Sequence, residues 1–416
     1  MQDVYIVGAY TTPFKRHIDK SIRDLSREAY MGVLADAGMA KGDGIEFAWF
    51  GNCMADYWGQ AVVRGQISFV PLVQEGLFPD RVPMINVEGG CATASMAFHG
   101  AWKDILSGQS DLSLAIGVEK LYDPEGGEEM LTRFSGGRAP FDREELFGEY
   151  RRIAGKIGRS FAPGPGRTLP MDTYAMQAAY HMHRWGTTRE QIAYCASKNH
   201  FHGSLNPKAQ YRFQMTPEEV LADRKVIDPL TRAMCSPIGD GAAAALLCSE
   251  RHLQSVAPEV RARAVKIRAS VFTGGKMRSE DEPSLSRVAA EKAYRKADVK
   301  PSDIDVAEVH DATSFGEIYQ MEMLGFCRDG EGGPFVASGA TRLGGAIPVN
   351  TSGGLVSKGH PLGATGLSML AELATQLRGE AGERQVVNAR LALQENGGGL
   401  LGLEEAACSV VILERN

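Results

Sequence analysis

Residues 26–52, SREAYMGVLADAGMAKGDGIEFAWFGN, and residues 284–311, SLSRVAAEKAYRKADVKPSDIDVAEVHD, follow one plan. In both segments alanine recurs with leucine or valine at spacings of three and four residues, which is the period of an amphipathic helix. A short polar turn then stops the helix, and a strand that ends in polar residues follows. The two segments therefore predict a helix–turn–strand unit that the chain uses twice.

The same alternation of strands and helices runs through most of the 416 residues. Such alternation predicts an α/β fold built in layers, with functional residues at the ends of strands. We interpret the chain as two similar α/β halves, residues 1–120 with 235–255 and residues 256–416. The strongest strand candidates are VYIVGAY (4–10), DLSLAIGV (111–118), GAAAALLCS (241–249) and CSVVILER (408–415).

Residues 121–234 differ from both halves in composition and in hydrophobic pattern. Glycine, proline and arginine are frequent there, strand-like alternation fades, and helical segments follow. A structureless loop of this length is implausible inside a domain, so we expect a folded insertion that covers the first half. A run of five basic residues without an acidic one fits either a solvated face or a dock for a phosphorylated cofactor tail. The five are Arg151, Arg152, Lys156, Arg159 and Arg167.

The overall composition is that of an ordinary globular protein. A net charge of −6 gives no reason to expect a nucleic acid or an anionic membrane as a partner. The first residues, MQDVYIVGAY, predict a strand rather than a signal peptide. No run of about eighteen apolar residues predicts a transmembrane helix. We therefore expect a cytoplasmic protein.

Seven cysteines are spread along the chain. Their odd number and wide spacing argue against a disulfide framework, and no pair has zinc-ligand spacing, so we expect no metal site. Most of them lie in apolar stretches, where a cysteine acts as a small buried hydrophobe. Only Cys91 requires another account.

Cys91 follows two glycines in residues 86–102, NVEGGCATASMAFHGAW. The pattern predicts a strand, a tight turn and a helix, with Cys91 at or near the helix N-terminus. The helix dipole and unpaired N–H groups there favour the thiolate of a side chain that titrates at about 8.5 when free. The glycines let the backbone turn sharply and leave room for a thioester. Taken alone, the pattern fits both a nucleophile and a buried core cysteine.

Two histidines stand in specific settings. His360 is fixed between a glycine and a proline in residues 350–366, NTSGGLVSKGHPLGATG. A histidine held rigidly in a glycine-rich turn can lie near a thiol and accept its proton. His310, in residues 308–318, EVHDATSFGEI, ends the strand of the second repeat, where α/β sheets commonly place site residues. A purely structural hydrogen bond is the alternative for His310.

The fourth segment with candidate functional residues is a triple-glycine turn. Gly397, Gly398 and Gly399 lie in residues 392–402, ALQENGGGLLG, directly after a strand. Such a turn can aim backbone N–H groups into a cavity, which suits an oxyanion hole. A plain flexible hairpin is the alternative.

Together these segments resemble the thiolase superfamily, and the resemblance extends over the whole chain. GGCATA resembles the nucleophile turn of that family, and GGLVSKGHPLGATG resembles its second catalytic loop. CSPIGDGAAAALL, residues 235–247, resembles the stretch that closes the first half. The resemblance implies two duplicated βαβαβαββ halves in five layers, with a loop domain at residues 121–234 that holds coenzyme A. It also implies a homodimer or homotetramer.

The resemblance assigns a role to each candidate site residue. Cys91 takes the acyl group from coenzyme A, and His360 activates Cys91 as a general base. His310 helps to form the oxyanion hole for the enolate of the second acyl unit. The backbone N–H groups of Cys91 and of the Gly397–Gly399 turn hold the oxyanion of the acyl-enzyme, and Ser236 contacts the pantetheine arm. Coenzyme A is then a substrate, and no permanently bound cofactor is expected.

Two departures from the family pattern stand out. Common thiolases carry Asn-Glu where this chain has His310-Asp311, a pair that resembles the sterol-carrier-protein-associated and archaeal branches. Where ordinary thiolases place an acid/base cysteine, two residues before the glycine turn, this chain has Glu395. The sterol-carrier-protein-associated branch moves that cysteine to just after the His-Asp pair, where this chain has Ala312 and Thr313. Glu395 is a candidate acid/base, and a turn-stabilising glutamate is the alternative.

The resemblance implies a thiolase-type acyltransferase, of the acetyl-CoA acetyltransferase or 3-ketoacyl-CoA thiolase kind. Such an enzyme forms or cleaves a carbon–carbon bond of an acyl-CoA thioester through an acyl-enzyme on Cys91. The missing cysteine leaves decarboxylative condensation or simple acyl transfer open as a second hypothesis. A third hypothesis is a coenzyme A-binding subunit that acts in a complex with a small OB-fold partner protein.

Overall fold

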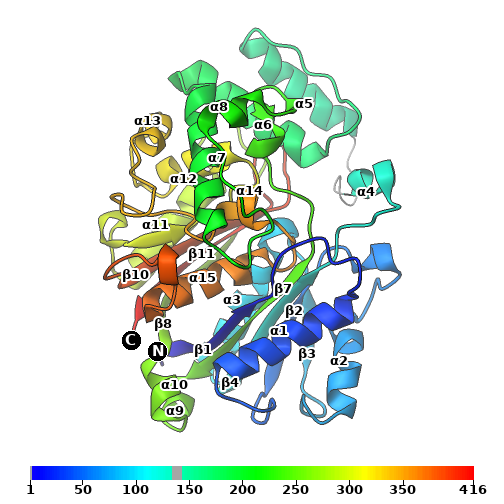
Figure 1. Ribbon diagram of the computed structural model, residues 1–416, viewed down its shortest axis with the longest axis vertical. Coiled ribbons are helices and arrows are strands. Elements are labelled where there is room, and N and C mark those ends of the chain that lie inside the picture. The colour runs from blue at the N-terminus through cyan, green and yellow to red at the C-terminus, as the bar shows by residue number, and fades with distance from the viewer. Residues whose placement is uncertain (1, 134–142) are drawn as a thin grey trace.

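The structure of the protein is a computed structural model that describes residues 2–133 and 143–416. Nine strands in these ranges form one mixed sheet in the order β3-β2-β4-β7-β1-β8-β11-β10-β9 (Figure 1). Only two residue pairs, Tyr5 with Lys266 and Ile6 with Val265, join β1 to β8, so the sheet divides there into two halves. The first half contains β1 (Val4–Thr11), β2 (Phe47–Gly51), β3 (Met84–Val87), β4 (Leu112–Glu119) and β7 (Gly241–Ser249). The second contains β8 (Val265–Gly274), β9 (Val306–Glu308), β10 (Leu391–Gly398) and β11 (Ala407–Arg415).

The two halves repeat the same order of elements. The first half runs β1-α1-β2-α2-β3-α3-β4-β7, and the second runs β8-α11-β9-α12-α15-β10-β11. The predicted duplication is confirmed, with one difference: the third strand of the second half is reduced to a single bridge between Val349 and Ala307. Pro348, which precedes Val349, has no N–H to contribute to a longer ladder. The helices of this repeat are α1 (Ile22–Asp36), α2 (Arg64–Gln74), α3 (Thr93–Leu106), α11 (Leu285–Ala297), α12 (Ser314–Met323) and α15 (Thr365–Arg378).

These elements stack in five layers. Helices α1 and α2 cover the outer face of the first half, α11 and α12 cover that of the second, and α3 packs on α15 between the halves. The alternation of side chains along β7 shows the layering, because Ala245 and Leu247 belong to the central core while Ala244 and Leu246 belong to the core under α1. The predicted five-layer α/β fold is confirmed.

Helix α1 shows how the sequence sets a helix end. The Ser21 side chain accepts the backbone N–H of Asp24, and the Asp24 carboxylate accepts the backbone N–H of Ser21, which is a capping box. The helix therefore begins at Ile22, one turn before the apolar periodicity of residues 26–52 becomes clear.

The long insertion between β4 and β7 is mostly helical. Its helix α7 packs on α12 and on two short helices of the second half, α13 (Gly332–Ala337) and α14 (Gly354–Lys358). The insertion therefore packs mainly on the second half and not, as expected, on the first, which it contacts at Lys208 through Phe14 and Tyr10. Helix α7 carries small and apolar residues on several faces. Four of them are buried in the core of the second half: Ile192, Ala193, Cys195 and Ala196. The insertion contains α4 (Gly127–Arg133), α5 (Arg143–Lys156), α6 (Leu169–Trp185), α7 (Arg189–Ser204), α8 (Pro217–Ala222), β5 (Lys225–Ile227), β6 (Leu230–Thr231) and η3 (Arg232–Met234).

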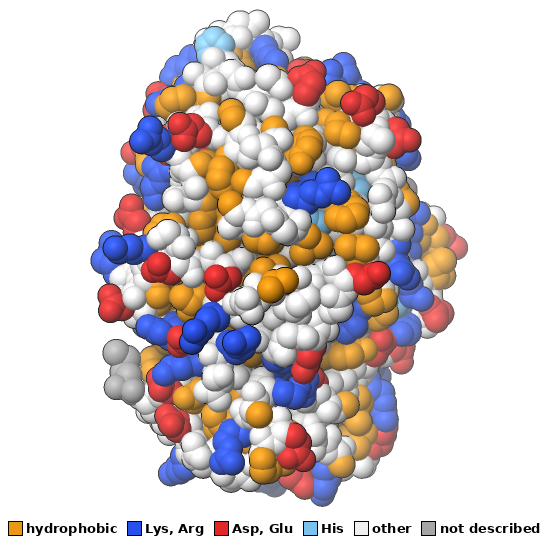
Figure 2. All heavy atoms as spheres, turned by 60° about the vertical axis from the view of Figure 1, so that its left-hand side comes forward, with side chains coloured by type: hydrophobic (Ala, Val, Ile, Leu, Met, Phe, Trp, Pro, Cys, Tyr) orange, Lys and Arg blue, Asp and Glu red, His pale blue; other side chains and the backbone are white. Residues whose placement is uncertain are grey.

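Short helices and turns complete the described chain. No helix in the described ranges is both long and apolar enough to cross a membrane. On the face that Figure 2 presents, Lys and Arg side chains lie among Asp and Glu side chains. The remaining elements are η1 (Ala55–Trp58), η2 (Gly90–Ala92), α9 (Glu250–Leu253), α10 (Pro258–Ala262), η4 (Pro301–Asp303), α13 (Gly332–Ala337), α14 (Gly354–Lys358) and η5 (Gly382–Arg384).

The central layer leaves no room for a side chain at Gly366. A Cβ atom there would stand 2.8 Å from the Ser95 backbone nitrogen of α3 and 2.6 Å from the Asn396 amide oxygen. We expect Gly366→Ala to lower the free energy of unfolding by about 1–3 kcal/mol, because it overpacks this contact. Gly155→Ala is the matched control, since its Cβ meets nothing within 4 Å and alanine favours the helix α5. Urea unfolding of both variants tests this; equal midpoints would contradict it.

Candidate active site

A cavity of about 1180 Å³ opens where the insertion meets the ends of the central helices. Cys91, His360, Ser236 and Gly399 all line it. The insertion contributes the stretch 166–171 and Tyr174 to its wall. The cavity therefore collects candidate residues from four separate segments of the sequence.

Cys91 stands in the turn between β3 and α3. Gly90 has φ +58°, which a residue with a side chain rarely adopts, and its N–H donates to the Glu88 carboxylate at 2.7 Å. The Thr93 hydroxyl accepts the N–H of Gly89 at 2.8 Å and fixes the other side of the turn. Cys91 is half-buried at the cavity wall, directly before the central helix of the first half.

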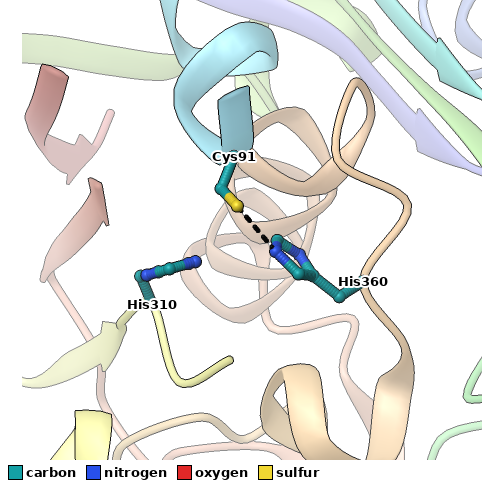
Figure 3. Close-up of side chains that lie close together, drawn as sticks. All are labelled: Cys91, His310 and His360. Atoms are coloured by element: carbon teal, nitrogen blue, oxygen red, sulfur yellow. Dashed lines mark hydrogen bonds between the residues drawn. The ribbon is translucent and has the colours of Figure 1, made fainter. Parts of the chain in front are cut away.

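His360 faces Cys91 from the corresponding loop of the second half, directly before α15. Its Nε2 lies 3.0 Å from the Cys91 sulfur (Figure 3), and its Nδ1 lies 2.8 Å from the Thr365 hydroxyl. That hydroxyl donates its only proton to the Pro361 carbonyl at 3.0 Å, so Nδ1–H donates to Thr365 and the lone pair of Nε2 faces the thiol. Burial, with the positive charges of His310 and Lys358, lowers the pKa of His360 well below its usual value.

One buried carboxylate anchors the loop of His360 to the first half. Glu119, at the end of β4, accepts the N–H of Gly363 at 3.0 Å. It also accepts the backbone N–H groups of Cys53 at 3.0 Å and Met54 at 3.1 Å, just after β2. Burial raises the pKa of Glu119 to about 7. The position of His360 relative to Cys91 therefore depends on a glutamate that the sequence did not single out.

His310 lies just after β9, behind the other two residues. A ring nitrogen of His310, a ring nitrogen of His360 and the Cys91 sulfur all lie within 4.8 Å of one another, and the His310 ring points toward the sulfur (Figure 3). His310 is 2% exposed and does not line the cavity. Its Nδ1 lies 3.2 Å from the Glu405 carboxylate, while its buried Nε2 has no hydrogen-bond partner among the described residues. Burial alone lowers the pKa of His310, but the adjacent Cys91 and Glu405 outweigh it and raise the pKa well above its usual value.

The triple-glycine turn touches the Cys91 turn backbone to backbone. A Cβ atom at Gly398 would stand 2.7 Å from the Cys91 nitrogen, and one at Gly90 would stand 2.5 Å from the Gly399 nitrogen. Gly399 has φ +72° and lines the cavity, while Gly397 and Gly398 end strand β10. Only glycines allow the two turns to approach this closely.

Glu395 is buried inside the protein and does not line the cavity. On β10 the Gln394 side chain reaches Ser95 of the central layer, so Glu395 points the opposite way. Its carboxylate accepts the backbone N–H of His310 at 3.1 Å and the Ser286 hydroxyl at 3.0 Å. Burial and the negative charge of Glu405 raise the pKa of Glu395 to about 7.

The basic run of the insertion is largely paired with carboxylates. Of its five residues only Arg167 lines the cavity, where it lies 2.5 Å from Asp172. The cavity has three further arginines, Arg64, Arg133 and Arg232, which the sequence did not single out. The other four basic residues pair outside the wall: Arg151 with Glu144, Arg152 and Lys156 with Glu280, and Arg159 with Asp228.

Sequence reasoning missed two residues that hold the histidines, Thr365 and Glu405. Glu405 carried a detectable signal, because Glu404 and Glu405 are adjacent acids directly before the apolar strand β11. Thr365 carried none beyond its place in the glycine-rich loop. The structure brings Cys91, His360 and His310 together with the glycine turn, places Ser236 on the same cavity, and leaves Glu395 outside it.

Comparison with known proteins agrees with this arrangement. The chain is 37% identical over 407 residues to an acetyl-CoA acetyltransferase of Methanothermobacter thermautotrophicus, covering 97% of this chain and 98% of that protein. It is 36% identical over 405 residues to sterol carrier protein 2 of Gallus gallus, covering 95% of this chain and 69% of that protein. Among solved structures, the Ltp2-ChsH2(DUF35) aldolase has the same fold, with a TM-score of 0.77 and 21% identity over 99% of this chain and 98% of that one.

Sequence profiles of a known family cover nearly the whole chain. The profile of the thiolase N-terminal domain matches residues 4–251, and that of the thiolase C-terminal domain-like region matches residues 275–415. The first match spans the first half together with the insertion, the second spans most of the second half, and the two contain all three residues of the cysteine–histidine cluster. The chain therefore belongs to the thiolase family.

Proposed function

We propose that the protein is a thiolase-type acyltransferase that carries an acyl group from coenzyme A on Cys91. The observation that carries this proposal is the 3.0 Å contact between the Cys91 sulfur and the unprotonated nitrogen of His360, at the wall of a large cavity. A nucleophile, a base within hydrogen-bond reach and a third group that orients the base form the arrangement that covalent catalysis requires. Thr365 is the orienting group.

The first half-reaction follows from this geometry. His360 accepts the Cys91 proton, and the sulfur attacks the thioester carbonyl of an acyl-CoA. The backbone N–H groups of Cys91 and Gly399, brought together by the contact of the two turns, would hold the oxyanion. The coenzyme A thiolate then leaves and takes the proton back from His360, so the acyl group stays on Cys91.

The second half-reaction involves His310. Its Nε2 is buried beside the reacting sulfur without a hydrogen-bond partner among the described residues, which suits a donor reserved for a developing negative charge. We propose that it stabilises the enolate of the second acyl unit as a carbon–carbon bond forms or breaks.

Coenzyme A and acyl-CoA are the proposed substrates. The cavity is large enough for an extended thioester, and Ser236 lines it. Of the further arginines at its wall, Arg133 pairs with Glu129 and Arg232 with Asp223, while Arg64 donates to the backbone carbonyls of Ala61 and Asn52. Arg64 therefore adds positive charge for the phosphate groups, together with Arg167 of the basic run. That the enzyme holds no permanent cofactor remains a prediction.

A second candidate function is decarboxylative condensation. It is favoured by the absence of a second cysteine at Ala312, which lines the cavity, and by the burial of Glu395 outside the cavity. A decarboxylating enzyme needs no base for the α-proton, because loss of carbon dioxide generates the enolate. Comparing malonyl-CoA with acetyl-CoA as the second substrate separates the two functions.

The assembly state is also a proposal. Strand β3 is an edge strand, with Ile85 39% exposed, and Val62 and Val63 are exposed beside it. Exposed edges of this kind pair with a second copy, which supports a homodimer or homotetramer. The Ltp2 structure has a second component, ChsH2(DUF35), and it motivates the proposal of a small partner protein. The OB-fold of that partner and the cytoplasmic location remain predictions.

Acylation of Cys91 tests the main proposal. Incubation with acetyl-CoA should add one acetyl group to the peptide that contains Cys91, as seen by mass spectrometry, and Cys91→Ala should abolish both this label and turnover. Cys327→Ser is the matched control, because Cys327 is similarly half-buried but lies away from the cavity. An unlabelled Cys91 in the wild-type protein would refute the proposal.

The acid side of the pH profile tests the role of His360. Because its pKa lies well below 6.5, the imidazole stays neutral and able to accept a proton at about pH 6. Acyl-enzyme formation should therefore slow only at more acidic pH. His360→Asn should slow it by about 10²–10⁴-fold and remove this limb. Stopped-flow measurements across the pH range check both; a wild-type limb at or above 6.5 would count against the assignment.

Replacing Glu395 separates its two interpretations. Glutamine at this position keeps one oxygen, which can accept the His310 N–H, while its amide N–H can donate to the Ser286 hydroxyl oxygen once that hydroxyl turns. We expect Glu395→Gln to leave the rate of 3-ketoacyl-CoA thiolysis within about threefold, since Glu395 does not reach the cavity. A loss of about 10²-fold or more, in a variant of unchanged stability, would make Glu395 the acid/base.

A further inference from the structure

Two glutamates and a cysteine form a buried cluster behind His310. Glu395, Glu405 and Cys408 place their side-chain oxygens and sulfur within 4.8 Å of one another. All three are buried, with Glu405 8% exposed and the other two fully enclosed. Two carboxyl groups this close are stable in the interior only when one carries a proton or a cation faces them.

The contacts of the two glutamates divide their roles. Glu395 uses its oxygens on the His310 backbone N–H and the Ser286 hydroxyl, and the Cys408 thiol lies 3.4 Å away. Glu405 instead reaches the ring of His310, with 3.2 Å between its Oε1 and Nδ1. Burial and the negative charge of Glu405 raise the pKa of Glu395, whereas the carboxylate of Glu405 faces the ring of His310.

The backbone is shaped to admit Glu405. A Cβ atom at Gly397 would overlap the Glu405 carboxylate, so the first glycine of the triple-glycine turn provides the space in which this carboxylate lies. Gly398 and Gly399 have a different function, since they pack on the nucleophile turn. The Glu405 side chain therefore has a defined position in the fold, although the residue lies in a loop.

His310 is surrounded by ionisable groups from several elements. Cys91 and His360 lie in front of it, the ring of Tyr174 from α6 lies 6.2 Å from its ring, and the two glutamates lie behind it. At the ring of His310, the Glu405 carboxylate lies 3.2 Å from Nδ1, and the Cys91 sulfur lies within 4.8 Å of a ring nitrogen.

We propose that Glu405 is the positioning residue of His310: its carboxylate accepts the Nδ1 proton and keeps the ring positively charged, with Nε2–H directed at the reacting sulfur. This inference rests on the proposed acyl transfer and supplies a partner that the family motifs leave unassigned. The Cys91 sulfur adds to the 3-keto carbonyl of a 3-ketoacyl-CoA, the carbon–carbon bond breaks, and the acyl group stays on the sulfur as a thioester. The electron pair of the broken bond becomes the enolate of the departing acyl-CoA, which then takes up one proton from solvent and so balances the proton that Cys91 gave to His360. Nε2–H donates a hydrogen bond to that enolate. No electron is exchanged with the protein, and the Nδ1 proton stays between His310 and Glu405.

Glu405→Gln tests this assignment, because glutamine keeps the shape but removes the charge. The pH at which His310 titrates, followed by NMR with ¹⁵N-labelled histidine and assigned with His310→Gln, should fall by about 1–3 units. The alkaline limb of thiolysis should move to lower pH by a similar amount, because an uncharged His310 is a weaker donor to the enolate than a charged one. The kcat at about pH 8 should fall at least about tenfold, with a smaller change in KM.

Glu404→Gln is the matched control. Its Oε1 accepts the backbone N–H groups of Leu285 at 3.1 Å and of Glu405 at 3.2 Å, which a glutamine oxygen also accepts, and its carboxylate lies 3.4 Å from Arg278. It should leave the titration of His310 unchanged. If Glu405→Gln folds poorly, Glu405→Asp retains the charge and should give a smaller shift in the same direction.

The possible outcomes are distinct. A His310 titration in Glu405→Gln equal to that of the wild type overturns this inference. The titration needs no substrate, so it stands even if Cys91 fails to become acylated. A failure of acylation in the wild-type protein would instead refute the proposed acyl transfer.

Discussion

The site depends on one contact: two glycine turns from opposite halves of the chain meet backbone to backbone. Gly90 beside Cys91 and the end of the triple-glycine turn leave no space for a Cβ atom on either side. This contact fixes the nucleophile turn of the first half against the second half, which carries both histidines. The distances from Cys91 to the two histidines depend on this contact, because the nucleophile and the histidines belong to different halves.

Buried carboxyl groups support this junction from both sides. Glu119 ties the loop of His360 to the ends of β2 and β4. In the second half, the Asp311 carboxylate accepts the Leu355 N–H at 2.6 Å and the Asn199 amide of α7 at 2.8 Å. The insertion therefore does more than form the cavity wall, since α7 braces the turn that follows His310. Such buried polar groups are costly unless fully paired, and here they specify the position of backbone that carries the site.

Much of this could be predicted from the sequence. The repeated helix–turn–strand pattern gave the duplication, and the glycines around Cys91 and His360 marked the close approach, because both are local signals. The direction of the Glu395 side chain was harder to predict. Successive side chains along a strand point to opposite faces of the sheet, and the sequence does not show which of these faces Gln394 and Glu395 each occupy. The partners Glu405 and Thr365 depend on contacts across the fold or within an irregular loop. The half of the molecule on which the insertion packs could not be predicted either, because the apolar residues of α7 do not indicate which surface they contact.

The shortened third strand of the second half has a further consequence. Cys91 follows β3 and precedes α3, while His360 follows the single bridge at Val349 and precedes α15. The thiol and the imidazole thus occupy equivalent places in the two copies of one unit. A symmetric pair of identical units would bring two like residues face to face, thiol to thiol or imidazole to imidazole, and neither pair combines a sulfur nucleophile with a base. Joining both copies in one chain lets their loops diverge, so that one loop keeps its strand and presents the acid while the other gives up its strand and presents the base.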